Sequence, residues 1–213
     1  MLDLIQWLFT DDGQNDGRLV ELSEAKQILN YAMALSMSGT NSVLSDDARL
    51  LALSRRQTTE TLEKHYQYID ILSRKLPWQL KNENADWTKI ARENLLVEAL
   101  DPPKEKVAQI FFRCRAETEG LITILAVLRY KADKGQVPEK LDELVTTGYL
   151  KTLASDPFGD KTFTYKRTDE GFTLYSFGLN LTDDGGKAGL SPTSKQPTRW
   201  ADNGDTVFWP VLR

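Results

Sequence analysis

Residues 156–186 read DPFGDKTFTYKRTDEGFTLYSFGLNLTDDGG and predict a β-hairpin closed by an acidic, glycine-rich loop. Phe163 and Tyr165 alternate with polar residues, which is the pattern of a strand with one buried face. Residues 168–171 have the composition of a tight turn, and a second alternating segment at 172–177 returns beside the first. A last short strand at 206–211 would extend the hairpin into a small antiparallel sheet.

The segment 104–134 has the spacing of one long helix. Asp101-Pro102-Pro103 marks its start, because proline is tolerated in the first turn of a helix and aspartate is a strong cap. Gly135 suits the left-handed residue that closes a helix. Its buried stripe is expected to comprise Val107, Ile110, Phe111, Cys114, Leu121, Leu125 and Leu128, widened by Ile122, Ile124 and Val127.

The first hundred residues are predicted to be helical. Ser23 would cap a helix that runs to about Ser36, and Ser45 would cap a second helix that ends near Pro77. A third helix is expected at 85–99. The second helix has one apolar stripe, formed by Thr58, Leu62, His65, Ile69, Leu72 and Leu76.

The order of these segments predicts an α+β chain of two domains. An all-helical domain would occupy 1–101, and a long helix packed on a small three- or four-stranded antiparallel sheet would occupy 102–213. The longest apolar run, 121–128, is far shorter than the roughly 20 residues that span a bilayer. The opening MLDLIQWLF lacks the basic start and cleavage pattern of a signal peptide, so a short helix is expected there.

Composition gives little support to catalysis or to nucleic-acid binding. The net charge of −4 supplies no electrostatic attraction for nucleic acid. The single histidine, His65, lies on an apolar stripe, where a hydrogen-bonded core residue is expected, and the single cysteine, Cys114, is expected to be a buried thiol. No phosphate-binding loop, zinc spacing or nucleophile elbow occurs, which favours a non-enzymatic protein, although distant carboxylates could still assemble an acid–base site.

A series of short motifs after the long helix resembles a known family. The motifs are Gly135-x-Val137-Pro138-x-x-Leu141-x-x-Leu144, Gly148-Tyr149-Leu150, Asp156-Pro157-Phe158-Gly159, Tyr165 and Tyr175-Ser176-Phe177-Gly178. Their order and spacing are similar to those of the globular part of the major pseudopilin of the type II secretion system, and of pseudopilin-like domains in planctomycete envelope proteins. The resemblance covers roughly 104–213 and implies a pilin-like fold. The chain lacks the prepilin cleavage motif and hydrophobic helix of a pseudopilin, which argues against filament assembly.

The resemblance also implies calcium, because that pseudopilin family binds calcium in the loop that closes its sheet. The matching positions are Ser176, Asn180, Asp183, Asp184, Asp202 and Asp205. Calcium prefers six to eight hard oxygen ligands, which these residue types supply, while a solvated acidic loop is the alternative. A second acidic cluster at 11–17 fails the EF-hand spacing, because the twelfth position counted from Asp12 is Ser23 and not glutamate.

These observations lead to three hypotheses of function. The first is a non-enzymatic structural or interaction protein of a bacterial cell envelope, extracytoplasmic, with a protein partner and with membrane attachment only through a segment N-terminal to this sequence. The second is a protein- or peptide-binding module that uses the helical domain, which an aromatic surface groove in that half would favour. The third is an enzyme. The aromatic residues near the C-terminus are expected to fill the core of the sheet rather than to form a stacking surface.

Overall fold

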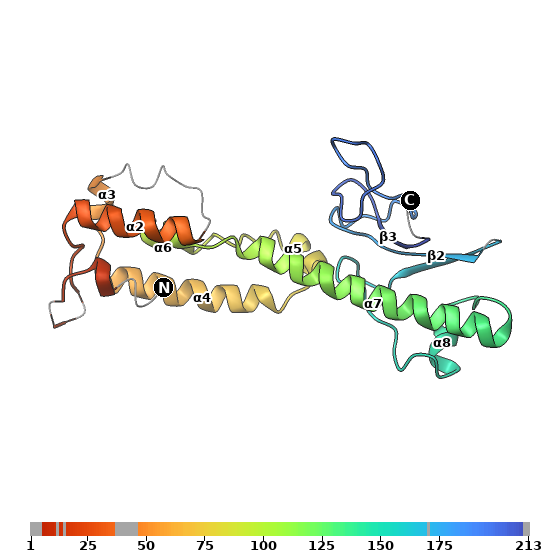
Figure 1. Cartoon of the computed structure of the whole chain (residues 1–213). Helices are drawn as coiled ribbons and strands as arrows, with labels where there is room; N and C mark the ends of the chain where they lie inside the picture. Colours follow the sequence, from red (N-terminus) through yellow and green to blue (C-terminus); the bar gives the residue numbers. More distant parts are fainter. Residues whose placement is uncertain (1–5, 12, 15, 37–46, 170, 211–213) are drawn as a thin grey trace. The chain divides into compact units, whose positions relative to one another are not determined.

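The computed structural model describes residues 6–11, 13–14, 16–36, 47–169 and 171–210, with the backbone alone described at 31–36 and 48–49 (Figure 1). The chain forms two compact units. The helical unit comprises Met1–Lys75 and Asn84–Ala108, and the sheet unit comprises Leu76–Glu83 and Gln109–Arg213. The division falls at 75/76, at 83/84 and, inside the long helix, at 108/109, whereas the sequence predicted domains of 1–101 and 102–213.

The helical unit contains α2 (Leu22–Ser36), α3 (Asp47–Leu51), α4 (Arg55–Ser73), the 3-10 helix η2 (Ala91–Glu93) and α6 (Leu95–Leu100). Helix α6 packs against α2, α3 and α4. Its start is fixed by Asn94, whose side-chain oxygen accepts hydrogen bonds from the backbone N–H groups of Leu96 and Val97. The core consists of Leu8, Phe9, Leu19, Ala25, Leu29, Leu50, Leu62, Ala91, Leu95, Leu96, Val97, Ala99 and Leu100.

Several expected helix boundaries in this unit are wrong. The helix expected from Ser45 to Pro77 is two helices, because Ser54 caps α4 by accepting a hydrogen bond from the N–H of Gln57; Ser45 itself lies outside the described residues. The helix expected at 85–99 is a turn followed by η2 and α6, interrupted where Asn94 adopts an extended backbone. Helix α2 begins one residue before Ser23, so that residue does not cap it.

The apolar stripe of α4 is largely confirmed. Thr58, Leu62, His65 and Leu72 are buried, whereas Ile69 is half-buried. Leu76 lies beyond the end of α4 and precedes the short helix α5 (Pro77–Asn82) of the sheet unit. Pro77 thus begins a helix, as proline does in a first turn, and does not end the preceding one.

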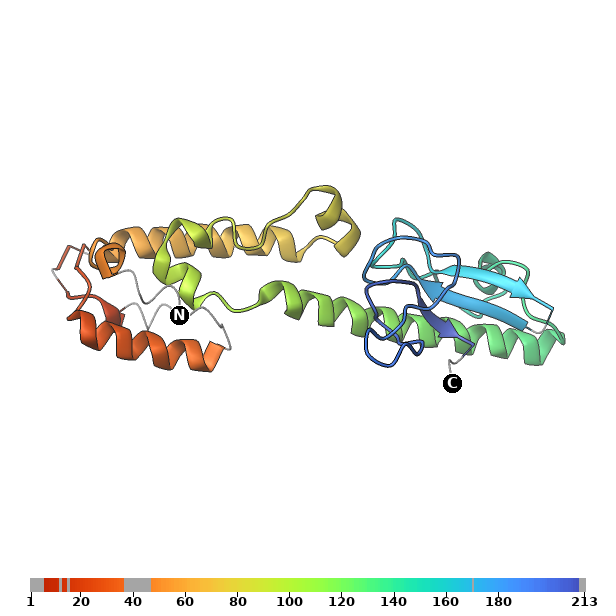
Figure 2. The ribbon, with the colours of Figure 1, turned by 90° about the horizontal axis from the view of Figure 1, so that it is seen from above.

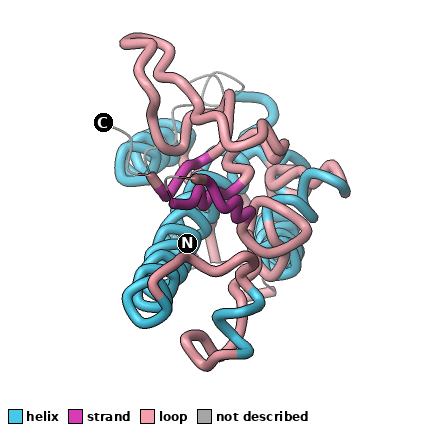
Figure 3. The backbone as a smooth tube through the Cα atoms, turned by 90° about the vertical axis from the view of Figure 1, so that its right-hand side faces the viewer, coloured by secondary structure: helices cyan, strands magenta, loops and turns pink. Residues whose placement is uncertain are grey.

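The sheet unit contains α5, most of α7 (Lys104–Lys134), α8 (Asp142–Thr146) and the strands β1 (Thr164–Thr168), β2 (Gly171–Ser176) and β3 (Thr206–Trp209). Among the described residues the strands form one antiparallel sheet in the order β1-β2-β3 (Figure 2). Figure 3 shows the strands together, in magenta. The expected hairpin is confirmed, with Tyr165 opposite Leu174. The α+β class and a long helix beside a three-stranded sheet are therefore both observed; the expected end of β3 at 211 lies outside the described residues.

The buried face of α7 is not the expected one. The helix buries Phe112, Ala116, Gly120, Thr123, Ile124, Ala126 and Val127. At Gly120 an added Cβ would lie 2.9 Å from the Phe208 ring, so this glycine allows close approach of helix and sheet. The expected stripe is therefore wrong at Val107, Ile110, Phe111, Cys114, Leu121, Ile122 and Leu125, all of which are exposed, and correct at Ile124 and Val127.

Candidate functional site

Exposed apolar side chains occupy the side of α7 that does not face the sheet. Ile110, Phe111, Leu121 and Leu125 are 58%, 61%, 56% and 57% exposed. We call this surface the α7 apolar face; it comprises Ile110, Phe111, Cys114, Leu121, Ile122 and Leu125. The face has two parts, at 110–114 and 121–125, and the exposed polar residues Glu117 and Thr118 lie between them. Exposed apolar side chains gathered on one side of a helix mark an interaction site more often than scattered ones do.

A groove of about 360 Å³ borders this face, and Leu121 belongs to both. Glu117, which lines the groove, accepts a hydrogen bond from the indole N–H of Trp200, at 2.7 Å. Arg199, which also lines it, donates to the backbone carbonyl oxygen of Phe208 in β3, at 3.3 Å. The groove is lined by Glu117, Thr118, Leu121, Ile124, Arg199, Phe208 and Trp209.

Most of the C-terminal aromatic residues are packed in the core of the sheet unit, as expected. Phe158 and Phe208 are buried, and Trp200 packs against both, with ring centroids 5.2 Å and 6.4 Å away. Trp209 is half-buried and lines the groove. The aromatic side chains thus fix the shape of the groove, and only Trp209 adds appreciable accessible aromatic surface to it.

The acidic loop brings four of the six expected calcium ligands together. The carboxylate of Asp205 is buried and accepts hydrogen bonds from the backbone N–H groups of Asp184 (3.2 Å) and Gly186 (2.6 Å). Asp183 accepts from the hydroxyl of Tyr175, at 3.0 Å, and Asp184 accepts from the side-chain amide of Asn180, at 2.7 Å. Burial raises the pKa of Asp205, although the two backbone N–H groups oppose this shift.

The other two expected ligands are placed elsewhere. The hydroxyl of Ser176 donates to the carboxylate of Asp156 at 2.7 Å, and Asp202 is exposed. Within the described ranges, no group of three or more His, Cys, Asp or Glu side chains has the geometry to hold a metal ion. The hydrogen bonds engage one oxygen each of Asp183 and Asp184, which leaves a second oxygen on each that fits the hard-oxygen preference of calcium.

Asp156 is a structural residue that the sequence indicated only as part of a motif. Its side chain is buried, and one oxygen accepts from the N–H of Phe158 (2.9 Å) and from Ser176, while the other accepts from the N–H of Phe177 (3.0 Å). Burial raises the pKa of this carboxyl group, and the three hydrogen bonds oppose the shift. Asp156 therefore ties the 156–159 turn to the end of β2.

His65 is buried in the helical unit, as expected for a core histidine. Its Nε2 lies 2.8 Å from Oδ1 of Asp101, and the ammonium group of Lys104 pairs with the same carboxylate. Burial and then the charge of Lys104 lower the pKa of His65 to about 4, and burial lowers the pKa of Lys104 to about 8. Asp101 thus binds two side chains instead of capping α7, which begins at Lys104.

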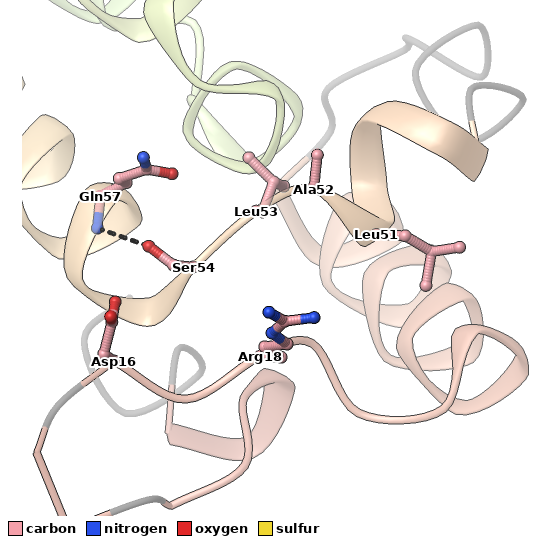
Figure 4. A pocket seen from close by; sticks show the side chains of 7 residues that line it. All are labelled: Asp16, Arg18, Leu51, Ala52, Leu53, Ser54 and Gln57. Atoms are coloured by element: carbon pink, nitrogen blue, oxygen red, sulfur yellow. Dashed lines mark hydrogen bonds between the residues drawn. The ribbon is translucent and has the colours of Figure 1, made fainter.

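The helical unit has an open pocket of about 350 Å³ near the start of α4 (Figure 4). Ser54 and Gln57 lie on one side of it and are joined by the hydrogen bond that caps the helix. The lining is Asp16, Arg18, Leu51, Ala52, Leu53, Ser54 and Gln57. This pocket contains no aromatic side chain, so it does not provide the aromatic groove that would favour peptide binding by this unit.

No helix among the described residues is both long and apolar enough to cross a membrane. Comparisons of the chain with protein-family models, with curated proteins and with solved structures gave no significant match.

Proposed function

We propose that this chain is a non-enzymatic interaction protein of a bacterial cell envelope, with a pseudopilin-like sheet unit that binds a protein partner through α7. The observation that carries the proposal is the α7 apolar face beside its groove. Full burial of an exposed apolar side chain contributes about 1.5–3 kcal/mol, so a partner that covers these side chains, which are about half exposed, would gain roughly half of that for each. Such a surface is maintained most readily where a partner covers it.

The pseudopilin-like assignment is supported by contacts between the motifs. The hydroxyl of Tyr165 in β1 donates to the carbonyl oxygen of Pro138, at 2.6 Å. The backbone N–H groups of Tyr149 and Leu150 both donate to the carbonyl oxygen of Leu144. The segment that follows α7 is therefore joined to the hairpin by the residues that carry the resemblance.

The non-enzymatic assignment is supported by three buried titratable groups whose pKa values are shifted. His65 has no solvent-exposed surface, and Asp156 and Asp205 are each nearly fully buried. Each is hydrogen-bonded to groups of its own unit. Their perturbed pKa values accordingly have structural causes.

The proposal is tested in native cells with a photo-crosslinking amino acid placed at Leu121. We expect a covalent adduct with one protein, mapped by mass spectrometry, and recovery of the chain in the envelope fraction. Ile71, which is 54% exposed in α4, is the matched control position and should give no adduct. Adducts at Ile71 alone would favour partner binding by the helical unit, and no adduct at either position would contradict the proposal.

The proposal also includes a calcium ion at the acidic loop, held by Asp183 and Asp184. Millimolar calcium should raise the melting temperature of the sheet unit by several degrees relative to chelator, because a ligand that binds only the folded state stabilises it. The double variant Asp183→Asn, Asp184→Asn should lose this effect. Asp202→Asn, at an exposed position outside the loop contacts, should retain it. Coincident melting curves in calcium and chelator would exclude the ion.

A further inference from the structure

One line of positions along the exposed side of α7 has a regular spacing of three and four residues. Within the sheet unit the line runs through Phe111, Cys114, Thr118, Leu121, Leu125 and Leu128, and the same spacing continues to Val107 and Ala132. All of these positions are exposed except Leu128, which is half-buried. This is the heptad spacing of helices that pair side by side, and the opposite side of α7 already packs on the sheet.

The area of the α7 apolar face can be compared with that of a stable interface. Its five large side chains are between 46% and 61% exposed, and a large apolar side chain presents on the order of 150–200 Å² when fully exposed, so the face amounts to about 500 Å². Two such faces in contact would bury about 1,000 Å², which is the minimum for a specific interface. The area of the face is thus just sufficient for a dimer.

The residues beside the heptad line are compatible with such self-pairing. Arg115 and Ile122 flank it on one side, and Ile110 and Glu117 flank it on the other. In a parallel pair the first side of one helix meets the second side of its partner, which sets Arg115 opposite Ile110 and Ile122 opposite Glu117. Like charges therefore do not oppose each other along this stretch.

We propose that a second copy of this chain covers the α7 apolar face, so that two α7 helices pair along the heptad line in a closed, two-fold dimer. This inference rests on the proposed function and names the partner as the chain itself. A two-fold pair uses the same surface on both copies and leaves no open end for further addition. The dimer therefore differs from a filament, in which each subunit presents two different surfaces.

Sedimentation equilibrium of the purified full chain tests this inference. We expect a species of twice the 24.2 kDa chain mass that dissociates on dilution. The double variant Leu121→Glu, Leu125→Glu should weaken self-association at least tenfold, because pairing would bury unpaired carboxylates. The matched control Ile71→Glu changes a similarly exposed apolar residue of α4 and should still dimerise.

The thiol of Cys114 gives a second measurement, because it lies on the face. Its alkylation rate should fall as the protein concentration rises, and the Leu121→Glu, Leu125→Glu variant should alkylate quickly at every concentration.

A monomer whose thiol is protected at all concentrations would show that the chain covers its own face, and would overturn the dimer. A monomer that still gives Leu121 adducts with another protein in cells would overturn the dimer and leave the proposed function standing. A monomer without such adducts would contradict both.

Discussion

His65 and Asp156 are buried titratable side chains, one in each unit, and both are held by specific partners. The Nε2 of His65 faces Asp101, and the carboxylate of Asp156 accepts three hydrogen bonds. The pKa values of the two residues shift in opposite directions, because burial lowers the pKa of His65 to about 4, whereas burial raises the pKa of Asp156 against the effect of its three hydrogen bonds. The contribution of His65 to stability is therefore tested by a change of pH, and that of Asp156 by removal of its carboxylate.

Acidification should destabilise the helical unit through His65. Its pKa falls from 6.5 to about 4 on folding, so the unfolded chain takes up the proton first as the pH decreases. The stability is therefore complete above pH 6.5 and is lost as the pH falls towards 4, by at most about 3 kcal/mol. Urea unfolding followed by circular dichroism at a series of pH values measures this loss.

The variant His65→Gln is the control for this pH dependence. Glutamine keeps an N–H donor for Asp101 and does not titrate in this range. Its stability should be lower than that of the parent at pH 7 but should change much less between pH 6.5 and 4. An unchanged pH profile would show that another group is responsible.

Removal of the Asp156 carboxylate should destabilise the sheet unit strongly. Asp156→Ala leaves the N–H groups of Phe158 and Phe177 and the hydroxyl of Ser176 without their acceptor. We expect a loss of about 3 kcal/mol, because each buried unsatisfied donor costs roughly 1–3 kcal/mol. Hydrogen exchange at the two backbone amides should accelerate. Asp160→Ala, at an exposed position in the same turn region, should leave this exchange unchanged.

At the scale of elements, the sequence predicted the helix α7 but could not decide which of its sides is buried. Both of its sides carry apolar residues at helical spacing, and the larger residues predicted the wrong buried side. The sheet selects the side with Ala116 and Gly120, because small residues let the helix axis approach the strands. Periodicity identifies a helix reliably, but the choice between two apolar sides depends on the shape of the packing partner.

Gly120→Ala tests this close approach. Alanine in a helix interior is favoured over glycine by about 1 kcal/mol, but its methyl group would lie within 3.0 Å of the Phe208 ring. Overpacking of a core costs about 1–3 kcal/mol, so a net loss of about 1 kcal/mol is expected in urea unfolding. Thr118→Ala, at an exposed position on the other side of α7, should be neutral or slightly stabilising. A stabilised Gly120→Ala protein would contradict the tight contact.

The hairpin and the acidic loop were more accessible to sequence reasoning. Alternation placed β1 and β2 nearly correctly, because a short strand pair is specified by its own residues and turn. The loop prediction brought Asp183, Asp184 and Asp205 together but missed that Ser176 turns to Asp156. That contact joins segments twenty residues apart in sequence, and no local pattern predicts it. The α7 apolar face was not predicted as an exposed surface, because both sides of α7 carry apolar residues and its larger residues were expected to be buried.

At the scale of the whole molecule, the chain forms two units and passes between them three times, before and after α5 and within α7. The core of the helical unit is formed only by residues of 1–75 and 84–108. Phe208 and Gly120 meet inside the other unit. Each unit therefore contains its own source of stability, and a change in one core acts first on the unit that contains it.

Thermal unfolding of the full chain should accordingly show two transitions that respond to different variants. Lowering the pH from 7 to 5 should shift the transition of the helical unit through His65, whereas Gly120→Ala should shift the other transition by several degrees. Because the two sites share no core, their effects should add in the combined experiment, Gly120→Ala at pH 5, within about 0.5 kcal/mol. Differential scanning calorimetry resolves the transitions, and the response of each transition to pH or to Gly120→Ala identifies the unit that it belongs to. A single transition that moves as one with either change would show that the continuous helix α7 couples the two cores into one cooperative unit.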